Sequence, residues 1–321
     1  MNYGILSTAS IVERYVAGIR ESKNNNVYGI ASRNIESAKK EAERLGIEHY
    51  YGTYEELLEE ENIDIVYIPT MNAIHMEWAK KALEHGKHVV VEKPFSLHKE
   101  EAQEVFVLAK EKNLFLMEAQ KSVFLPTTLK LKKLLENKIV GDIKYIELKA
   151  GFPARFATEH WMNDLSLGGG ALYGSATYTV EFLSFLFDYP NFVTNASFVK
   201  GPRTGDNIVN FHLSFEDILV SSTIAMHVPL KNEAVFYGTK GYIVVPNFWK
   251  SKGLDIVFPD HTEHFDFPYK SEFVYEVEHI SSCIEQGLCE SPVMYKERTL
   301  QTIELVEELY SIYKKKNLKN L

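Results

Sequence analysis

Residues Gly4-Ile5-Leu6-Ser7-Thr8-Ala9-Ser10-Ile11 form the first strand-to-helix turn that the chain predicts. In a dinucleotide-binding fold, backbone N–H groups and a helix N-terminus hold a pyrophosphate at such a turn. The glycine positions of the usual G-x-G-x-x-G pattern hold Ser7, Ala9 and Val12. Small residues still permit close approach to the backbone, and the three hydroxyls of the turn add donors. A serine-rich N-cap explains the same residues, so the turn alone leaves both interpretations open.

The sequence around this turn alternates between apolar runs and charged helical stretches up to about residue 120. The apolar runs lie at Gly4–Ser7, Val27–Ala31, Ile65–Ile68, His88–Val91 and Leu114–Met117. The helical stretches lie at Ile35–Leu45, Tyr54–Glu61, His75–His85 and Lys99–Lys112. Near-continuous apolar runs indicate strands covered on both faces. The repetition of strand and helix predicts parallel βαβ units, and therefore a doubly wound Rossmann sheet in a domain of residues 1–120.

The alternation of predicted strands and helices ends at about Pro126. We expect a helix at Thr127–Glu136, a strand at Ile143–Ala150, a Gly168-Gly169-Gly170 loop and an apolar helix at Ala171–Phe187. Short alternating segments between residues 192 and 267 then predict strands, and helical patterns cover Phe273–Glu285 and Lys296–Lys315. The overall fold class is therefore α/β. Residues 121–321 are predicted to form an α+β domain with a largely antiparallel, open sheet, for substrate binding and oligomerisation.

Composition narrows the class of partner. The 321 residues are 45% hydrophobic, enough for two domains with a core each. The 44 acidic residues outnumber the 35 basic ones, which argues against nucleic acid as the main partner. No apolar stretch approaches the roughly 20 residues of a membrane span, and no signal peptide is evident. Two cysteines, Cys283 and Cys289, suggest a reduced, cytoplasmic protein.

No metal site is expected, because His261 and His264 lie in a strand-like stretch without a third ligand nearby.

The second motif is Ala31-Ser32-Arg33, at the end of the second predicted strand. A site specific for NAD usually has an acidic residue here, which accepts from the ribose 2′-hydroxyl. A hydroxyl and a guanidinium suit a 2′-phosphate instead, because arginine makes a charge-assisted, bidentate contact with phosphate. We therefore expect NADP, with NAD possible. An exposed arginine that simply opens a helix is the alternative.

Two further motifs each follow a buried strand, at the carboxyl edge where open α/β sheets bind ligands. They are Pro69-Thr70-Met71-Asn72-Ala73-Ile74-His75 and Gly86-Lys87-His88-Val89-Val90-Val91-Glu92-Lys93-Pro94. The second ends with two adjacent charges and a ring that lacks an N–H, where the chain leaves the sheet. Taken alone, Glu92-Lys93-Pro94 would also suit a surface turn.

The order of these motifs resembles the Gfo/Idh/MocA family of sugar and polyol dehydrogenases, nearest its dimeric dihydrodiol dehydrogenase-like subgroup. The resemblance continues through Met117-Glu118-Ala119, Phe124, Pro126 and Gly168-Gly169-Gly170-Ala171-Leu172, and covers most of the chain. It implies that Lys93 lies at the nicotinamide and substrate, and that Tyr178 is the acid/base residue. It also implies a cis Lys93–Pro94 bond and a homodimer or homotetramer built on the open face of the second sheet.

The resemblance and the motifs together give a set of candidate site residues. Glu92 and Asn72 would hold the ribose, and His75 would contact the cofactor or support those that do. The substrate side would include Gln120, Lys121 and Trp161. The residues expected to bind the cofactor are Ser7, Thr8, Ala9, Ser10, Ile11, Ser32, Arg33, Pro69, Thr70, Asn72, His75, Glu92 and Lys93.

The expected reaction is reversible hydride transfer between nicotinamide and a carbinol or carbonyl carbon of a sugar, polyol or diol. Tyr178 would move the proton, provided that its pKa falls from about 10, and the Lys93 ammonium would favour its ionised form. Two positions depart from the family pattern: Gly174 where an Asp is common, and Val123 where an Arg is common. They motivate the alternative of a non-enzymatic NADP-binding sensor. A redox-assisted lyase or glycosidase is a further alternative.

Overall fold

The computed structural model describes residues 1–153, 156–188 and 192–317, and the chain forms two compact units. The first unit comprises Met1–Lys121 and Lys270–Leu300, and the second comprises Ser122–Tyr269 and the described residues from Gln301 onward. Each unit has its own sheet. None of the described helices is both long and apolar enough to cross a membrane.

A six-stranded parallel sheet forms the centre of the first unit, in the order β3-β2-β1-β4-β5-β6. This order confirms the predicted Rossmann fold, whose ligand crevice lies where the strand order reverses, between β1 and β4. The strands are β1 (Asn2–Leu6), β2 (Asn26–Ala31), β3 (His49–Tyr51), β4 (Ile65–Ile68), β5 (His88–Glu92) and β6 (Leu116–Ala119). The apolar pattern missed β3 because this edge strand has three residues, none of them fully buried.

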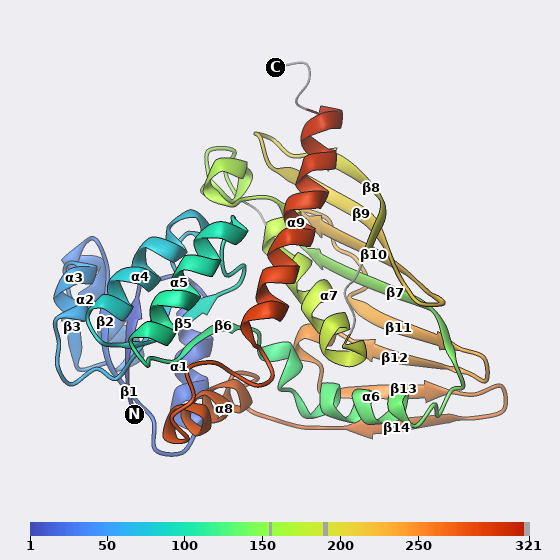
Figure 1. Ribbon diagram of the computed structural model, residues 1–321, viewed down its shortest axis with the longest axis horizontal. Coiled ribbons are helices and arrows are strands. Elements are labelled where there is room, and N and C mark those ends of the chain that lie inside the picture. Colours follow the sequence, from blue (N-terminus) through green and yellow to red (C-terminus); the bar gives the residue numbers. More distant parts are fainter. Residues whose placement is uncertain (154–155, 189–191, 318–321) are drawn as a thin grey trace. The chain divides into compact units, whose positions relative to one another are not determined.

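Two helices of the first unit begin at side chains suited to that position. Asn34 caps α2 by accepting from the backbone N–H groups of Glu36 and Ser37, and Thr53 and Glu56 form a capping box on α3. Helices α4 and α5 pack side by side over the sheet (Figure 1). The helices are α1 (Val12–Glu21), α2 (Ile35–Leu45), α3 (Tyr54–Leu58), α4 (His75–Glu84), α5 (Lys99–Glu111) and α8 (Val274–Glu285).

Residues 270–300 belong to the first unit, whereas the sequence pattern had predicted one domain of residues 121–321. Phe273 packs so closely on α1 that a Cβ added at Gly18 would lie 2.5 Å from the Phe273 Cβ. Glu272 forms an ion pair with Arg14, and the backbone N–H of Leu116 donates to the carbonyl of Cys289 at 3.0 Å. These contacts add α8 to the Rossmann sheet and its helices. The sequence pattern carries no sign of them.

An eight-stranded sheet dominates the second unit, in the order β14-β13-β12-β11-β7-β10-β9-β8. Strands β7 and β10 pair in parallel, and the other described pairs are antiparallel, which confirms the predicted sheet. The strands are β7 (Ile143–Phe152), β8 (Phe192–Lys200), β9 (Asp206–Phe215), β10 (Ile218–Met226), β11 (Glu233–Gly238), β12 (Tyr242–Pro246), β13 (Gly253–Val257) and β14 (Thr262–Asp266).

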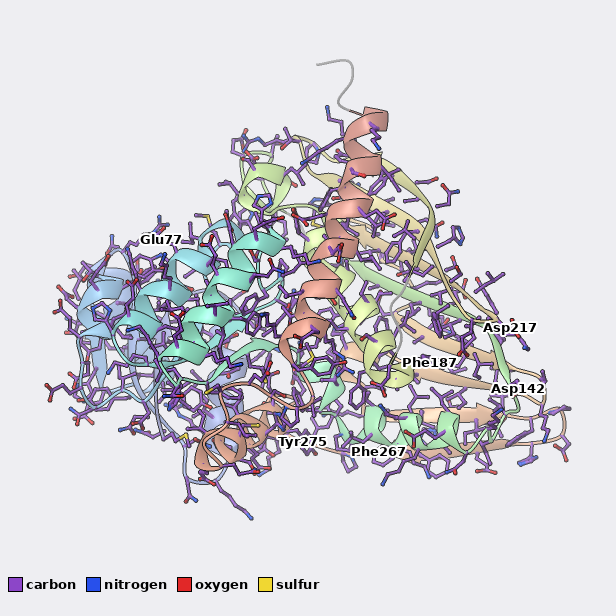
Figure 2. All side chains as sticks on the ribbon, in the orientation of Figure 1. Glu77, Asp142, Phe187, Asp217, Phe267 and Tyr275 are labelled. Atoms are coloured by element: carbon purple, nitrogen blue, oxygen red, sulfur yellow. The ribbon has the colours of Figure 1, made fainter. Side chains whose placement is uncertain are left out.

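Helices α6 (Pro126–Glu136) and α7 (Ala171–Phe187) cover one face of this sheet, and α9 (Lys296–Asn317) continues the chain into the unit. Most of α7 is buried, which explains why its sequence is largely apolar. Phe187 at its end (Figure 2) lies with its ring centroid 5.0 Å from that of Phe215. On the other face of the sheet, Tyr145 and Tyr237 stack while each keeps 38% of its surface exposed.

The start of α7 depends on a buried carboxyl group. Asp206 accepts from the backbone N–H of Leu172 at 3.0 Å and from the Tyr310 hydroxyl at 2.8 Å. Gly170, with φ 118°, leaves room for it, since a Cβ there would lie 2.3 Å from Asp206 Oδ1. The hydrogen bonds favour the ionised carboxylate, but burial outweighs them and raises the pKa of Asp206 to about 6.

An Asp206→Asn variant should become relatively more stable as the pH rises. Because the pKa of Asp206 is raised above its ordinary 3.8, the native state binds the proton more tightly than the unfolded chain. That contribution is present below about pH 4 and is lost as the pH passes about 6, a change of about 3 kcal/mol. Urea denaturation below pH 4 and above pH 6 should show that the free energy of unfolding of the variant rises relative to that of the native protein. A difference that does not vary with pH would contradict the assignment.

Candidate active site

The turn after β1 brings two of the predicted cofactor segments together. Ser7 has φ 116°, a conformation that glycine adopts readily and serine rarely. Its hydroxyl donates to the carbonyl of Pro69 at 2.9 Å and accepts from the N–H of Ala9 at 3.2 Å. The backbone N–H of Ser7 also donates to Ala31. Serine thus takes the place of the first fingerprint glycine, and its side chain ties the end of β1 to the end of β4.

The turn leaves the beginning of α1 available to a ligand. Ser7, Thr8, Ala9 and Ile11 are half-buried and Ser10 is exposed. The N-cap residue is Ile11, whose apolar side chain accepts no hydrogen bond, so the serine N-cap interpretation is wrong. Helix N-termini without a side-chain cap favour an anion. The donor set therefore fits a pyrophosphate.

The end of β2 presents the predicted 2′-phosphate residues. Ser32 is half-buried and its backbone N–H donates to Tyr51 at 3.2 Å, whereas Arg33 is exposed. In the part of the chain that the structure describes, no carboxylate forms an ion pair with Arg33. Burial raises the pKa of Tyr54, and the nearby positive charge of Arg33 partly opposes that rise. The guanidinium therefore lies beside Tyr54 with its own charge unneutralised.

His75 joins the loops that follow β4 and β5. Its Nδ1 lies 2.9 Å from the carbonyl oxygen of Pro94, and its Nε2 lies 3.2 Å from that of Thr70. The ring has no exposed surface, and burial lowers its pKa. Burial favours the supporting role of His75 over direct contact with a cofactor. Asn72, in the short helix η1 (Asn72–Ile74), keeps 8% of its surface exposed.

Glu92 and Lys93 leave the sheet in a fixed direction. Glu92 Oε1 accepts from the Tyr67 hydroxyl at 2.7 Å, and its Oε2 accepts from the backbone N–H of Lys93 at 3.1 Å. The Lys93–Pro94 bond is cis, as the resemblance predicted. Just beyond it, the backbone N–H of Phe95 donates to Glu118 Oε1 at 3.0 Å. Glu92 thus accepts from a buried neighbour, Tyr67, and its other carboxyl oxygen accepts from the backbone of Lys93.

A buried group of charges lies behind this edge of the sheet. Lys121 is 4% exposed, with its Nζ 4.9 Å from the centroid of the Phe273 ring, and Gln120 is fully buried. Burial lowers the pKa of Lys121 and raises that of Glu276, whose carboxyl oxygens find no hydrogen-bond partner in the described residues. Gln120 and Lys121 were expected to contact substrate. Both are buried.

Sequence reasoning missed Tyr67, Glu118 and Glu276. Tyr67 and Glu118 each interrupt an apolar strand with a polar group, and that interruption was a usable signal, because a buried polar group needs a partner. Glu276 gave none, since a glutamate in an amphipathic helix usually faces solvent.

The second unit carries Tyr178 on α7. Its side chain is 7% exposed and its ring stacks on Trp249, with 5.9 Å between centroids. One turn earlier, a Cβ at Gly174 would meet its nearest neighbour, Met162 Cε, at 3.8 Å, so the helix has space for a side chain there. Trp161 begins the short helix η3 (Trp161–Asn163), is half-buried and stacks on His160.

His264, one of the two histidines considered as metal ligands, lies on the mostly exposed strand β14, and its Nδ1 is 2.6 Å from an Asp255 carboxyl oxygen. The described residues contain no group of three or more histidine, cysteine or acidic side chains able to hold a metal ion.

The sequence and the fold match known proteins along most of the chain. A family model described as an oxidoreductase family with an NAD-binding Rossmann fold matches residues 1–120, and the Gfo/Idh/MocA C-terminal domain matches residues 128–244. The chain belongs to the Gfo/Idh/MocA family of oxidoreductases. It is therefore an enzyme of that class with an NAD-binding domain, as the motifs predicted.

Within the family, the chain is similar to trans-1,2-dihydrobenzene-1,2-diol dehydrogenases. It is 33% identical to the enzyme of Xenopus laevis, over 91% of this chain and 92% of that one, and 28% identical to the mouse enzyme, over 96% and 95%. A 3-ketoreductase from Actinomadura kijaniata, solved with NADP and TDP-benzene, has the same fold, with a TM-score of 0.89 and 24% identity over 97% of each chain. An aldose-aldose oxidoreductase from Caulobacter crescentus, solved with glycerol, superimposes with a TM-score of 0.86 and 22% identity, over 97% of this chain and 96% of that one.

Replacing Glu276 with Gln should stabilise the protein at alkaline pH. A raised native pKa means that this carboxyl group stabilises the fold while protonated, and that stability is lost as the pH climbs above its ordinary 4.5. Each pH unit between the unfolded and native pKa values removes about 1.4 kcal/mol. Chemical denaturation should show the variant's advantage growing with pH. Glu278→Gln, an exposed change on the same helix, is the control. A variant less stable at every pH would mean an ionised Glu276 paired with Lys121.

Proposed function

We propose that the protein is an NADP-dependent dehydrogenase, which moves a hydride between nicotinamide C4 and a carbinol or carbonyl carbon of a diol, sugar or polyol. One observation carries this proposal: Lys93 follows the carboxyl end of β5, the strand beside β4, on the same edge of the sheet at which the crevice between β1 and β4 opens. The similar diol dehydrogenases support the substrate class. The ketoreductase solved with NADP supports the cofactor.

The first unit supplies a contact for each part of the cofactor. The uncapped start of α1 and the turn at residues 7–11 suit the pyrophosphate, and Ser32 and Arg33 suit a 2′-phosphate. His75 contacts the carbonyls of Thr70 and Pro94, and Thr70, Asn72 and the Glu92–Lys93 edge would hold the ribose and nicotinamide. When bound, NADP supplies or accepts the hydride. The chain's own residues orient it and keep water away.

The affinity for NADP should exceed that for NAD at least tenfold, about 1.4 kcal/mol, because Arg33 offers its charge to a 2′-phosphate. Arg33→Ala should erase most of that gap, as measured by calorimetry with both cofactors. Arg44→Ala removes an arginine that Glu41 and Glu13 already neutralise, and should leave the gap unchanged. Equal affinities in the native protein would refute the assignment.

Two side chains would perform the chemistry. As the hydride leaves an alcohol carbon, the alcohol oxygen must lose its proton, and Tyr178 would accept it as general base. In the reverse direction the tyrosine returns the proton to the new alkoxide. The Lys93 ammonium would favour the ionised tyrosine and stabilise negative charge on the substrate oxygen.

Removing either group should lower turnover by about 10²–10⁴, the usual contribution of a general acid or base. Lys93→Met and Tyr178→Phe should each show this loss in steady-state kinetics, and the double variant should be little worse than the poorer single one. Tyr178→Phe should change the affinity for NADP far less than Arg33→Ala does. Tyr173→Phe, on the same helix, serves as the control.

Gly174 favours a second candidate, a non-enzymatic NADP-binding sensor, because the space there lacks the acidic residue common in the family. A sensor would bind NADP but would neither reduce dicarbonyls or ketoses nor oxidise diols. Its affinity for NADP would be unchanged by Tyr178→Phe. The same assays therefore separate the two functions.

We further propose that two copies associate through the open face of the second unit's sheet, as a dimer or as part of a tetramer. Leu219 is 63% exposed there and lies opposite Tyr145 in the register, next to the Tyr145–Tyr237 stack. A second copy would cover this apolar row. Both cysteines are free thiols, which suits a reducing compartment, so the cytoplasm is the proposed location.

A further inference from the structure

Three aromatic rings form a buried column in the first unit, which we call the aromatic column: Phe273, Tyr15 and Tyr67. The Tyr15 ring lies flat on that of Tyr67, with 3.6 Å between centroids and 5° between planes. Phe273 meets the edge of Tyr15, with 5.3 Å between centroids. None of the three exposes more than 1% of its surface. The column thus fixes the plane of the Tyr67 ring, and with it the place of the hydroxyl.

That hydroxyl is the polar end of the column. It donates to Glu92 Oε1 at 2.7 Å, while Glu92 Oε2 accepts from the backbone N–H of Lys93 at 3.1 Å. A glutamate side chain held at both oxygens loses its rotamer freedom before any ligand binds. Because one carboxyl group joins the two contacts, the direction in which Lys93 leaves β5 is coupled to the Tyr67 hydroxyl.

The neighbouring hydroxyl, that of Tyr15, makes a useful contrast. It is also buried, yet it has no hydrogen-bond partner in the described part of the chain. A phenylalanine would fill the same space at this position. Of the two stacked tyrosines, Tyr67 alone directs its hydroxyl at the Glu92–Lys93 edge.

We infer that Tyr67 is a positioning residue for hydride transfer, which acts through Glu92 to set the place of Lys93. The inference rests on the proposed function, in which Lys93 faces nicotinamide and substrate. Tyr67 takes no proton and contacts no substrate. Its hydroxyl holds the carboxyl group that holds the Lys93 backbone, and the aromatic column keeps that hydroxyl still.

Kinetics of four variants test this role: Tyr67→Phe, Glu92→Gln, the two together, and Tyr15→Phe as a matched loss of a hydroxyl from the same stack. We expect Tyr67→Phe to lower kcat about tenfold while the KM for NADP changes less than twofold. The double variant should be no slower than Glu92→Gln alone, because both changes break one arrangement. Tyr15→Phe should keep the native kcat.

Several results would overturn the inference: a native kcat in Tyr67→Phe, an equal loss in Tyr15→Phe, or losses that multiply in the double variant. A protein without any hydride transfer would sink the proposed function instead. In that case crystal structures of the native protein and Tyr67→Phe still decide. A Glu92 carboxyl group that turns away from the Lys93 N–H in the variant supports the positioning role, and an unmoved one refutes it.

Discussion

The hydrogen bond from the Ser7 hydroxyl to the Pro69 carbonyl joins the two strand ends between which the Rossmann sheet reverses its order. The ligand crevice of such a sheet opens at this point, so the rest of the site depends on how these ends are held. The same hydroxyl accepts from Ala9 and supports the left-handed backbone of Ser7. A glycine would adopt that conformation more easily but would leave β1 and β4 unlinked. Serine in place of the fingerprint glycine therefore adds a hydrogen bond between the ends of β1 and β4, although it is the less flexible residue.

The Ser7–Pro69 hydrogen bond is one of several that link chain segments at this edge of the sheet. His75 ties the loop after β4 to the loop after β5, and Tyr67 and Glu118 hold the chain on each side of the Lys93–Pro94 bond. All three side chains are almost wholly buried, where a lost hydrogen bond leaves an unpaired polar group costing about 1–3 kcal/mol. The positions of the half-buried motif residues Glu92 and Lys93 therefore depend on the buried side chains that pack behind them.

The sequence predicted both sheets because each has a distinct period: unbroken apolar runs in the first, alternation in the second. Helices α2 and α7 begin and end where their patterns predicted. Edge strand β3 was missed because it has too few buried residues to form a pattern. Less of the site could be predicted from the sequence. Motif spacing marks Lys93 but not Tyr67 or Glu276, because the partner of a buried polar residue depends on tertiary packing. The assignment of residues 270–300 to the first unit could not be predicted for the same reason, because the contact between Phe273 and Gly18 depends on close packing and not on a sequence motif.

The buried charged groups also couple helix α8 to the motif at the sheet edge. Lys121 and Glu276 lie behind the motif and each shifts the pKa of the other, while the charge of Glu92 raises the pKa of both. A substitution on α8, far along the chain from Glu92, therefore alters the electrostatic potential at the edge where a cofactor would lie. Replacing a solvent-exposed motif neighbour changes much less, because water screens it. The charges most able to tune this site are thus the ones that a motif search would never select.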